Sequence, residues 1–340
     1  MKYKQLGNSG LIVSELTFGC MLFGEGEYYG MKYTIDQAKA NDLVAESIEK
    51  GINFFDTADM YNNGVSEEIL GKSLGNQRKD VLISTKASFR AGGQAFNAGI
   101  GYKHIIEQVT SSLIRLNTDY IDVFLLHNDD PITPIDETLK AIEHIQQRGM
   151  VRYVGLSNFS AWKTGTMIQR QKDLNYSPFV ASQMHYSLLN REVESEFVPM
   201  SLHHGLGMMV WSPLSSGFLT GKYTRENPEP ADARLNTFDL GLFDREWAYD
   251  VVDKVKEVAQ KYDTTPIAVS IAWLLSKKVV STVLVGISKA EQLAANLAGA
   301  ELELLAEDIA ILDEITATKL RYPNTFIGLQ DGILKAAKTW

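Results

Sequence analysis

The sequence contains only one cysteine, Cys20, among its 340 residues, so no intrachain disulfide can form. This usage fits a reducing compartment. The chain also lacks any apolar run near the roughly 18 residues that a membrane-spanning helix requires. Residues 1–15 mix charged and polar side chains and lack the apolar stretch of a secretory signal. We therefore expect a soluble cytoplasmic protein with no membrane partner.

The sequence contains fewer positively charged than negatively charged side chains. The 33 Lys and Arg residues are outnumbered by 42 Asp and Glu residues, which gives a net charge of −9 at pH 7. Because nucleic acids and anionic membranes are themselves negative, this balance disfavours a general affinity for either. It leaves room for a small basic pocket that binds an anionic ligand.

Two familiar motifs are missing as well. No predicted strand is followed by the G-x-G-x-x-G of a dinucleotide-binding fold, so an open doubly wound sheet is the less favoured of two architectures. No two of the six histidines form an H-x-H pair, and the adjacent His203 and His204 precede a strand. A metal-dependent barrel hydrolase needs clustered ligands, so we expect no metal.

What the sequence does contain is a regular alternation of short apolar runs and amphipathic segments. Strict strand–helix alternation predicts a parallel sheet with right-handed crossovers. Eight such units predict an α/β fold of the closed (β/α)8 TIM-barrel type, with residues 1–340 as one domain. The predicted strands are residues 16–19, 52–55, 81–85, 120–126, 151–156, 179–182, 208–210 and 282–285.

Other segments have patterns of their own. Two short runs, 1–5 and 11–13, flank a Gly-rich turn and predict an N-terminal β-hairpin that caps the bottom of the barrel. Residues 24–34 are rich in Gly and Tyr, which predicts a loop. Extra helices are expected in the C-terminal part. The predicted helices are residues 35–50, 66–74, 104–116, 134–148, 160–170, 192–204, 246–262, 266–276, 290–297 and 306–318.

The stretch from 53 to 71 is the most informative in the chain. Its apolar run ends in a polar cluster at 56–61, and a turn follows at 62–64. Ser66 is then the predicted N-cap of the next helix. Ionisable groups at the end of a strand, just before a helix, are where parallel α/β proteins carry their chemistry.

Ionisable side chains also fall at the ends of later strands. Lys86 and His127 follow the next two strands, as Asp56 follows its own, and Tyr61 lies one turn further on. Taken singly, each has an ordinary alternative role as a helix cap, a solvated cation, a structural imidazole or a packed ring. Because the carboxyl ends of barrel strands converge on one face, the four together indicate a single site.

These four groups have a consistent chemistry. A tyrosine with an unperturbed pKa of about 10 is a poor acid near neutrality, and a neighbouring Lys⁺ lowers that pKa. Asp56 would hold Lys86 charged and in place, and His127 would donate a hydrogen bond to a carbonyl oxygen. The set therefore fits carbonyl reduction by hydride transfer.

Six segments carry a resemblance to a known family. They are DTADMYNNGVSEEILG at 56–71, STK ending at Lys86, LLH ending at His127, VGLSNF at 154–159, WSPLSSGFLTGKY at 211–223 and GISKAEQLAANL at 286–297. In this order and spacing, the chain from about Leu6 to Leu297 resembles the aldo-keto reductase family. It is most similar to the prokaryotic-type branch that is related to potassium-channel β-subunits.

The resemblance implies a barrel that binds NADPH in an extended pose across the strand ends. It implies Tyr61 as the catalytic proton donor, supported by Lys86 and Asp56, with His127 orienting the substrate carbonyl. It also implies that a loop at 212–219 lies over the pyrophosphate, with backbone N–H groups facing phosphate oxygens.

At the nicotinamide end, the resemblance implies that Ser157, Asn158 and Gln183 hydrogen-bond the carboxamide and that Trp211 stacks on the ring. At the adenosine end, Lys289 would face the 2′-phosphate at a helix N-terminus, which favours NADP over NAD. Ala295 stands where many members have Glu, so use of NAD as well stays open. The implied cofactor-binding residues are Gly19, Met21, Asp56, Ser157, Asn158, Gln183, Trp211, Ser212, Pro213, Leu214, Gly217, Leu219, Lys222, Arg234, Gly286, Ser288, Lys289, Gln292 and Asn296.

The main functional hypothesis is an NADPH-dependent reductase of a small aldehyde or ketone, sugar-like compounds included. The alternative is an NADP(H)-binding redox-sensing or regulatory subunit with slow turnover. The candidate walls of the substrate pocket are Met21, Phe23, Tyr28, Phe89 and the segment 322–326. The sequence leaves open the physiological substrate, the direction of the reaction in the cell and the formation of a homo-oligomer.

Overall fold

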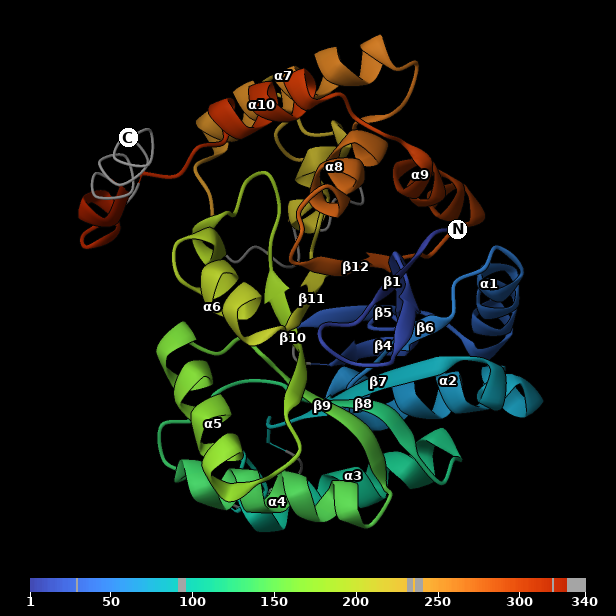
Figure 1. Ribbon diagram of the computed structural model, residues 1–340. Helices are drawn as coiled ribbons and strands as arrows, with labels where there is room; N and C mark the ends of the chain where they lie inside the picture. The colour runs from blue at the N-terminus through green and yellow to red at the C-terminus, as the bar shows by residue number, and fades with distance from the viewer. Residues whose placement is uncertain (29, 91–95, 231–234, 236–240, 320, 329–340) are drawn as a thin grey trace.

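A closed barrel of parallel strands forms the centre of the protein (Figure 1). The computed structural model describes residues 1–28, 30–90, 96–230, 235, 241–319 and 321–328. The barrel strands are β3 Leu16–Gly19, β6 Phe54–Asp56, β7 Leu82–Ala87, β8 Ile121–Leu126, β9 Val151–Ser157, β10 Phe179–His185, β11 Gly207–Trp211 and β12 Val280–Gly286. They follow one another around the barrel in chain order, and β12 returns to pair with β3. The predicted (β/α)8 barrel is confirmed.

All eight predicted strands are present, but most extend further than expected. Asp56 is the last residue of β6, and Lys86 and Gln183 lie within β7 and β10 rather than after them. For these three strands, the predicted end falls just before a charged or amide side chain. In the barrel, polar side chains at the carboxyl ends turn inward and are buried, so the ladder continues through them.

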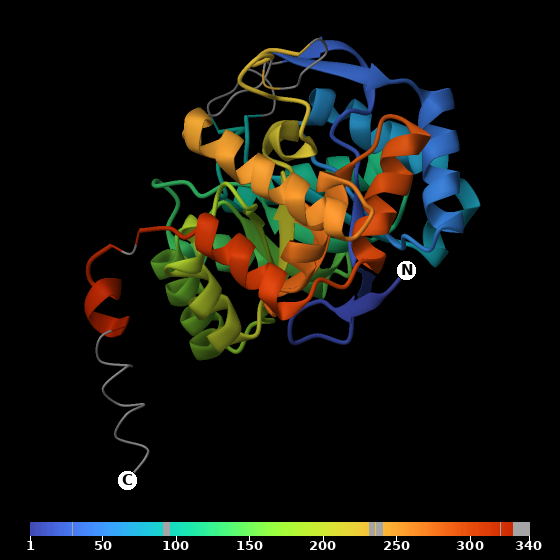
Figure 2. The ribbon, with the colours of Figure 1, turned by 90° about the horizontal axis from the view of Figure 1, so that it is seen from above.

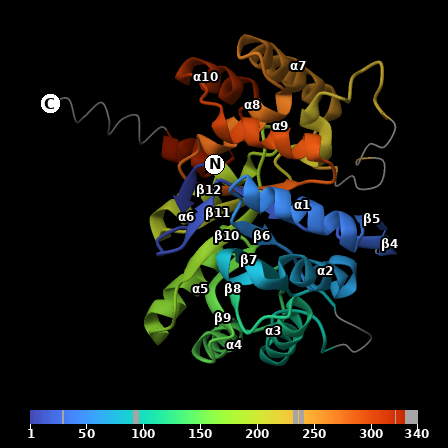
Figure 3. The ribbon, with the colours of Figure 1, turned by 90° about the vertical axis from the view of Figure 1, so that its right-hand side faces the viewer.

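Helices surround the barrel and connect its strands, and Figure 3 shows α1 and α2 side by side on one flank. They are α1 Gln37–Glu49, α2 Val65–Leu74, α3 Tyr102–Leu116, α4 Ile135–Gln147, α5 Ala161–Leu174, α6 Phe197–His204, α7 Arg245–Lys261, α8 Pro266–Leu275, α9 Ala290–Glu301 and α10 Ala306–Ile315. Apolar stripes on these helices pack against the outer face of the strands and form the larger of two core clusters.

Two helix predictions are corrected. The residue before α2 is Gly64, which has a left-handed φ of 90°, and Ser66 lies inside the helix, where its Oγ donates to the backbone oxygen of Cys20 at 2.8 Å. The single helix expected over 192–204 is broken into a 3₁₀ turn, Glu192–Glu194, and α6. Pro199 explains the break, because a residue without a backbone N–H is tolerated only in the first turn of a helix.

The predicted N-terminal hairpin is present and caps the bottom of the barrel. Strands β1 Tyr3–Gln5 and β2 Ile12–Ser14 pair antiparallel. Leu6 and Val13 are fully buried and belong to the smaller core cluster, which fills the barrel interior. Gly7 has a φ of +57°, and a Cβ there would lie 2.2 Å from the backbone oxygen of Val180, so only glycine fits this contact.

The loop predicted over 24–34 is wrong. Strands β4 Gly24–Tyr28 and β5 Met31–Ile35 form a second antiparallel hairpin, which follows the first barrel strand. Glycines alternate with polar residues in β4, so the sequence shows no apolar alternation there. Tyr33 and Ile35 of β5 are nonetheless buried and tie the hairpin to the barrel.

Residues 321–328, near the C-terminus, lie away from the barrel, as Figure 2 shows. Asn324 Nδ2 donates to the backbone oxygen of Ser195 at 3.4 Å. Tyr322 and Phe326 are 82% and 65% exposed, so they wall no pocket in this structure. Phe23, another candidate wall residue, is fully buried in the core against the ring of Phe18.

Candidate active site

A buried ion pair is at the centre of the candidate site. Lys86 is fully buried, and its Nζ lies 2.6 Å from Oδ2 of Asp56. The same Nζ donates to the backbone oxygen of Thr57 at 2.7 Å and lies 3.4 Å from Oη of Tyr61. Burial acts to lower the pKa of Lys86, but the charges of Asp56 and Tyr61 and the hydrogen bonds to both outweigh it, so the pKa is raised. Two of the other predicted ionisable groups, Asp56 and Tyr61, therefore lie next to the ammonium of Lys86.

The other carboxylate oxygen of Asp56, Oδ1, accepts two hydrogen bonds. Ser84 Oγ donates to Oδ1 at 2.6 Å, and Gln183 Nε2 donates to the same atom at 2.9 Å. Ser84 was missed at the sequence level, although it lies two residues before Lys86 and therefore faces the same side of β7. These bonds fix the orientation of the carboxylate that holds Lys86.

His127, the fourth predicted group, packs beside Tyr61. Its ring meets the Tyr61 ring edge-on at a centroid distance of 5.8 Å and the Phe89 ring at 4.9 Å. Burial and then the charge of Lys86 hold the pKa of His127 well below its ordinary value, so the imidazole is neutral. Within the described residues its Nδ1 has no hydrogen-bond partner. Phe89, a predicted wall residue, does border the site.

Trp211, two predicted neighbours and His185 form a linked group next to these residues. Trp211 Nε1 donates to Asn158 Oδ1 at 3.2 Å, and Asn158 Nδ2 donates to Ser157 Oγ at 3.0 Å. The imidazole of His185 stacks on the indole with centroids 4.5 Å apart. Burial lowers the pKa of His185 to about 4, so the stacked ring is neutral. His185 was not predicted, although it lies two residues beyond Gln183 in β10.

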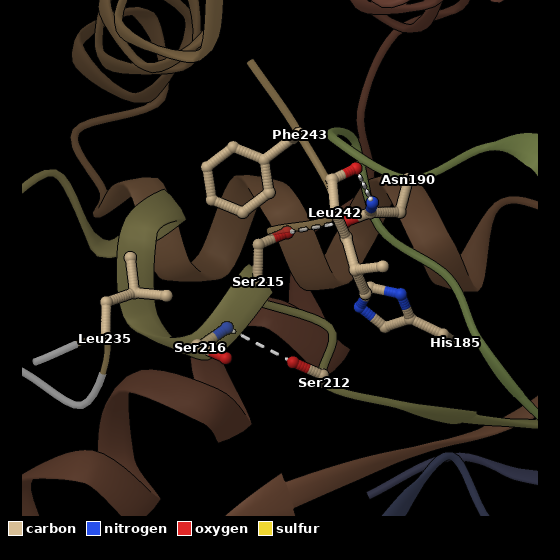
Figure 4. A pocket seen from close by; sticks show the side chains of 8 residues that line it. All are labelled: His185, Asn190, Ser212, Ser215, Ser216, Leu235, Leu242 and Phe243. Atoms are coloured by element: carbon tan, nitrogen blue, oxygen red, sulfur yellow. Dashed lines mark hydrogen bonds between the residues drawn. The ribbon is translucent and has the colours of Figure 1, made fainter. Parts of the chain in front are cut away.

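A pocket opens next to His185 and Ser212 (Figure 4). Ser212 has a positive φ of 53°, and its Oγ accepts the backbone N–H of Ser216 at 3.1 Å. Asn190 Nδ2 donates to the backbone oxygen of Leu242 at 2.9 Å and so joins the two sides of the pocket. The lining residues are His185, Asn190, Ser212, Ser215, Ser216, Leu235, Leu242 and Phe243.

The loop expected over a pyrophosphate forms one wall of this pocket. Its backbone amides at Gly217 and Leu219 both donate to the backbone oxygen of Leu214, at 2.9 and 3.2 Å. Pro213 and Leu219 are buried, so they support the loop from behind. The amides at 217 and 219 are therefore already hydrogen-bonded within the loop.

The predicted basic and adenosine-end residues lie further out. Lys222 is exposed, with its Nζ 5.4 Å from the centre of the Tyr223 ring. Lys289 is the exposed N-cap of α9, after Gly286 at the end of β12. The Oε1 of Gln292 accepts the backbone N–H of Ser288 at 2.7 Å, whereas Asn296 is buried. Arg234 lies outside the described residues.

Gly19 and its neighbours close the site on the β3 side. Gly19 lies in register with Asp56, and the backbone N–H of Cys20 donates to the backbone oxygen of Asp56 at 2.8 Å. Burial and then the charge of Asp56 raise the pKa of Cys20 well above its ordinary value, so it is an unreactive thiol. Met21 is half-buried next to it.

The β4–β5 hairpin holds the turn that carries Tyr61. Asn62 and Asn63 both adopt left-handed φ values, 47° and 53°. A Cβ at Gly24 would lie 2.1 Å from Asn62 Nδ2, and that amide lies 3.5 Å from the backbone oxygen of Glu25. The hairpin and the tyrosine turn therefore fit together with no space between them.

Gly24→Ala is accordingly expected to displace the Tyr61 turn. If the site is catalytic, turnover should fall by about 10- to 100-fold, since misplacement of a reacting group by about 1 Å costs this much. Gly26→Ala is the matched control, because Gly26 has the same kind of positive φ, +87°, but nothing within 4 Å of its Cβ position. Steady-state kinetics of both variants, and of Gly24→Ala/Asn62→Gly, measure the effect. An equal loss in the Gly26 variant, or no recovery in the double variant, would argue against the contact.

Comparison with known proteins identifies the fold family. Residues 15–317 match the model of the Aldo/keto reductase family. The chain belongs to this family. It is 38% identical over 306 residues to a "Probable voltage-gated potassium channel subunit beta" of Oryza sativa subsp. japonica, covering 87% of this chain and 90% of that protein. A protein of the same name from Arabidopsis thaliana is 34% identical, covering 96% and 100%. The "Versiconal hemiacetal acetate reductase" of Aspergillus parasiticus is 31% identical, covering 95% and 99%.

Membership of the aldo/keto reductases makes the chain an oxidoreductase, and the family generally uses NAD(P)H and small carbonyl substrates. In the described part of the chain, no cluster of three or more His, Cys, Asp or Glu side chains has the arrangement of a metal site. Among the described residues, no helix combines the length and the apolar character needed to cross a membrane.

Proposed function

We propose that this aldo/keto reductase is an NADPH-dependent reductase that converts a small aldehyde or ketone to the alcohol, with Tyr61 as the proton donor. The observation that carries the proposal is the contact between Tyr61 Oη and Lys86 Nζ, at 3.4 Å, in a site where Asp56 keeps Lys86 charged. A cation at this distance favours the negative charge that develops on the phenol oxygen as its proton leaves. When bound, NADPH supplies the hydride for the reduction.

The neighbouring residues suit the other tasks of this reaction. Neutral His127 can donate a hydrogen bond to the carbonyl oxygen and hold it near Tyr61, because its ring packs edge-on against the Tyr61 ring. Phe89, 39% exposed and packed on His127, gives the substrate an apolar contact.

The residues on the other side of the site suit a nicotinamide cofactor. The indole of Trp211 is held by Asn158 on its nitrogen and by His185 on one face, which leaves a fixed aromatic surface for a flat ring. The serine hydroxyls at 212 and 216 offer hydrogen bonds to phosphate oxygens, whereas the buried hydroxyl of Ser215 bonds to Asn190 and Ser187. Exposed Lys289, at the positive end of α9, suits a 2′-phosphate.

A cofactor titration tests the proposal directly. Quenching of tryptophan fluorescence should show that NADPH binds more tightly than NADH, and added aldehyde should then oxidise the bound NADPH. Lys289→Met should weaken NADPH binding by about tenfold, the worth of one charge-assisted hydrogen bond, and leave NADH binding unchanged. Binding of neither cofactor would overturn the proposal, and equal weakening of both would remove Lys289 from the phosphate site.

A second candidate function is an NADP(H)-binding regulatory subunit with slow turnover. It is favoured by the two relatives named as potassium channel β-subunits, at 38% and 34% identity. The titration separates the two functions, since a regulatory subunit would bind NADPH tightly but oxidise it slowly with every aldehyde tested.

A further inference from the structure

Asp59 is a buried carboxyl group that the proposed reaction does not use. It lies in the loop between Asp56 and Tyr61, and the residue is 7% exposed. Neither of its carboxyl oxygens makes a hydrogen bond of normal geometry among the described residues, although the backbone N–H of Met60 lies close enough to act on the group. Ionised carboxylates are rarely left in this state, because burying an unpaired charge costs several kcal/mol. The unpaired side chain therefore requires an explanation.

The charged groups around Asp59 are already paired with one another. Those that face it are Glu67 of α2, Arg115 of α3 and Lys86 of β7. Arg115 Nε lies 2.6 Å from Oε2 of fully buried Glu67, and Lys86 is held by Asp56. Arg115 is thus paired with Glu67, and Lys86 is paired with Asp56. Neither cation forms an ion pair with Asp59.

This arrangement keeps Asp59 protonated at neutral pH. Burial is the largest effect and the negative charge of Glu67 the second, and together they raise its pKa to about 8, against the opposing effects of Arg115, the backbone N–H of Met60 and Lys86. A neutral carboxyl can be buried at much lower cost than a carboxylate. Asp59 is therefore protonated in the folded protein at neutral pH, and it can lose its proton in mildly alkaline solution.

Asp59 is also joined to the catalytic groups by the backbone. Its N–H donates to the backbone oxygen of Lys86 at 3.1 Å, and the N–H of Tyr61 donates to the backbone oxygen of Ala58 at the same distance. A new negative charge here would oppose the charge that develops on the Tyr61 oxygen as it gives up its proton. It would also attract the Lys86 ammonium away from that oxygen.

We propose that Asp59 is an electrostatic positioning residue for the Tyr61–Lys86 pair, neutral in the active enzyme, whose ionisation slows carbonyl reduction. Its effect on rate rests on the proposed reductase function, whereas its protonation does not. The proton that leaves Asp59 passes to solvent, and no other bond changes.

The kinetic test is the pH profile of kcat for aldehyde reduction. In the wild type, kcat should fall about tenfold between pH 7 and pH 9, as expected when a group that titrates near 8 becomes largely ionised. Asp59→Asn, which has the shape of the neutral acid, should lose this decline. In Glu67→Gln, Arg115 is free to pair with the carboxylate of Asp59. The decline of kcat in this variant should therefore move to lower pH. Asp173→Asn, on the exposed side of α5, should keep the wild-type profile.

A second measurement does not depend on activity. The infrared difference spectrum of wild type minus Asp59→Asn at pH 7 should contain the carbonyl band of one protonated carboxyl group, and this band should disappear by pH 9. Absence of the band at pH 7 would overturn the inference whatever the kinetics show. If the band is present but kcat of Asp59→Asn declines with pH as in the wild type, the proposed role of Asp59 in catalysis is wrong. A band in a protein that reduces no aldehyde would instead count against the proposed function.

Discussion

Replacement of Tyr61 by Phe is expected to lower kcat for aldehyde reduction by about 10²- to 10⁴-fold, the usual contribution of a positioned general acid. The change removes one oxygen, the atom that lies 3.4 Å from Lys86 Nζ. The ring contacts with His127 and Lys86 remain available to Phe. Single-turnover and steady-state assays with a saturating aldehyde measure the loss.

Cofactor affinity separates this effect from misfolding. NADPH binding to Tyr61→Phe, measured by tryptophan fluorescence, should match that of the wild type, because Trp211 and its neighbours are untouched. Tyr3→Phe is the matched control, since Tyr3 lies in the N-terminal hairpin and its hydroxyl donates to the backbone oxygen of Gly51. Activity of Tyr61→Phe within about threefold of wild type would assign the proton to another group.

Removal of Asp56 is expected to have the largest effect on stability. Asp56→Ala leaves the Lys86 ammonium fully buried without its carboxylate, which should lower the free energy of unfolding by about 3–5 kcal/mol. Because the pKa of Lys86 is raised in the folded state, its stabilising effect is fully present below the ordinary lysine value and is lost only as the pH rises through the raised one. Urea unfolding at pH 7.5 therefore measures the intact pair.

A double variant identifies the cause of this loss. Asp56→Ala/Lys86→Met removes both charges and should recover a substantial part of the stability, since an apolar side chain can be buried without a partner. It should not recover activity. If the single variant loses less than about 1 kcal/mol, Lys86 must be discharged or hydrated when Asp56 is absent, and the pair is not the main support of the site.

Much of the site was predictable because its residues are defined by strand position. Asp56, Lys86 and His127 come from successive strands, and a closed barrel brings such residues together whatever the details of packing. Ser84 and His185 obey the same rule, two residues along from predicted ones, but their hydrogen bond and ring stack depend on side-chain directions that the strand pattern alone does not give.

Other features depend on contacts between distant segments. The sequence predicts a loop where β4 and β5 form a hairpin, because glycines replace side chains on one face of β4, and the hairpin packs against the Asn62 turn. Ser66 has the chemistry of a helix cap, yet the chain enters α2 through a left-handed glycine and buries the hydroxyl. The lack of a partner for Asp59 becomes visible only when every neighbouring charge has been placed.

The pairing of β12 with β3 has a consequence for synthesis on the ribosome. Thr17 and Thr282 share a hydrogen bond of 2.7 Å across this seam, although 265 residues separate them. Because the ribosome adds about 5–20 residues per second, one edge of β3 stays unpaired for roughly 10–50 s until β12 has been synthesised. An unpaired strand edge is prone to join the wrong strand. We expect the nascent chain to need chaperone protection until β12 has left the exit tunnel, and to lose that need once the seam closes.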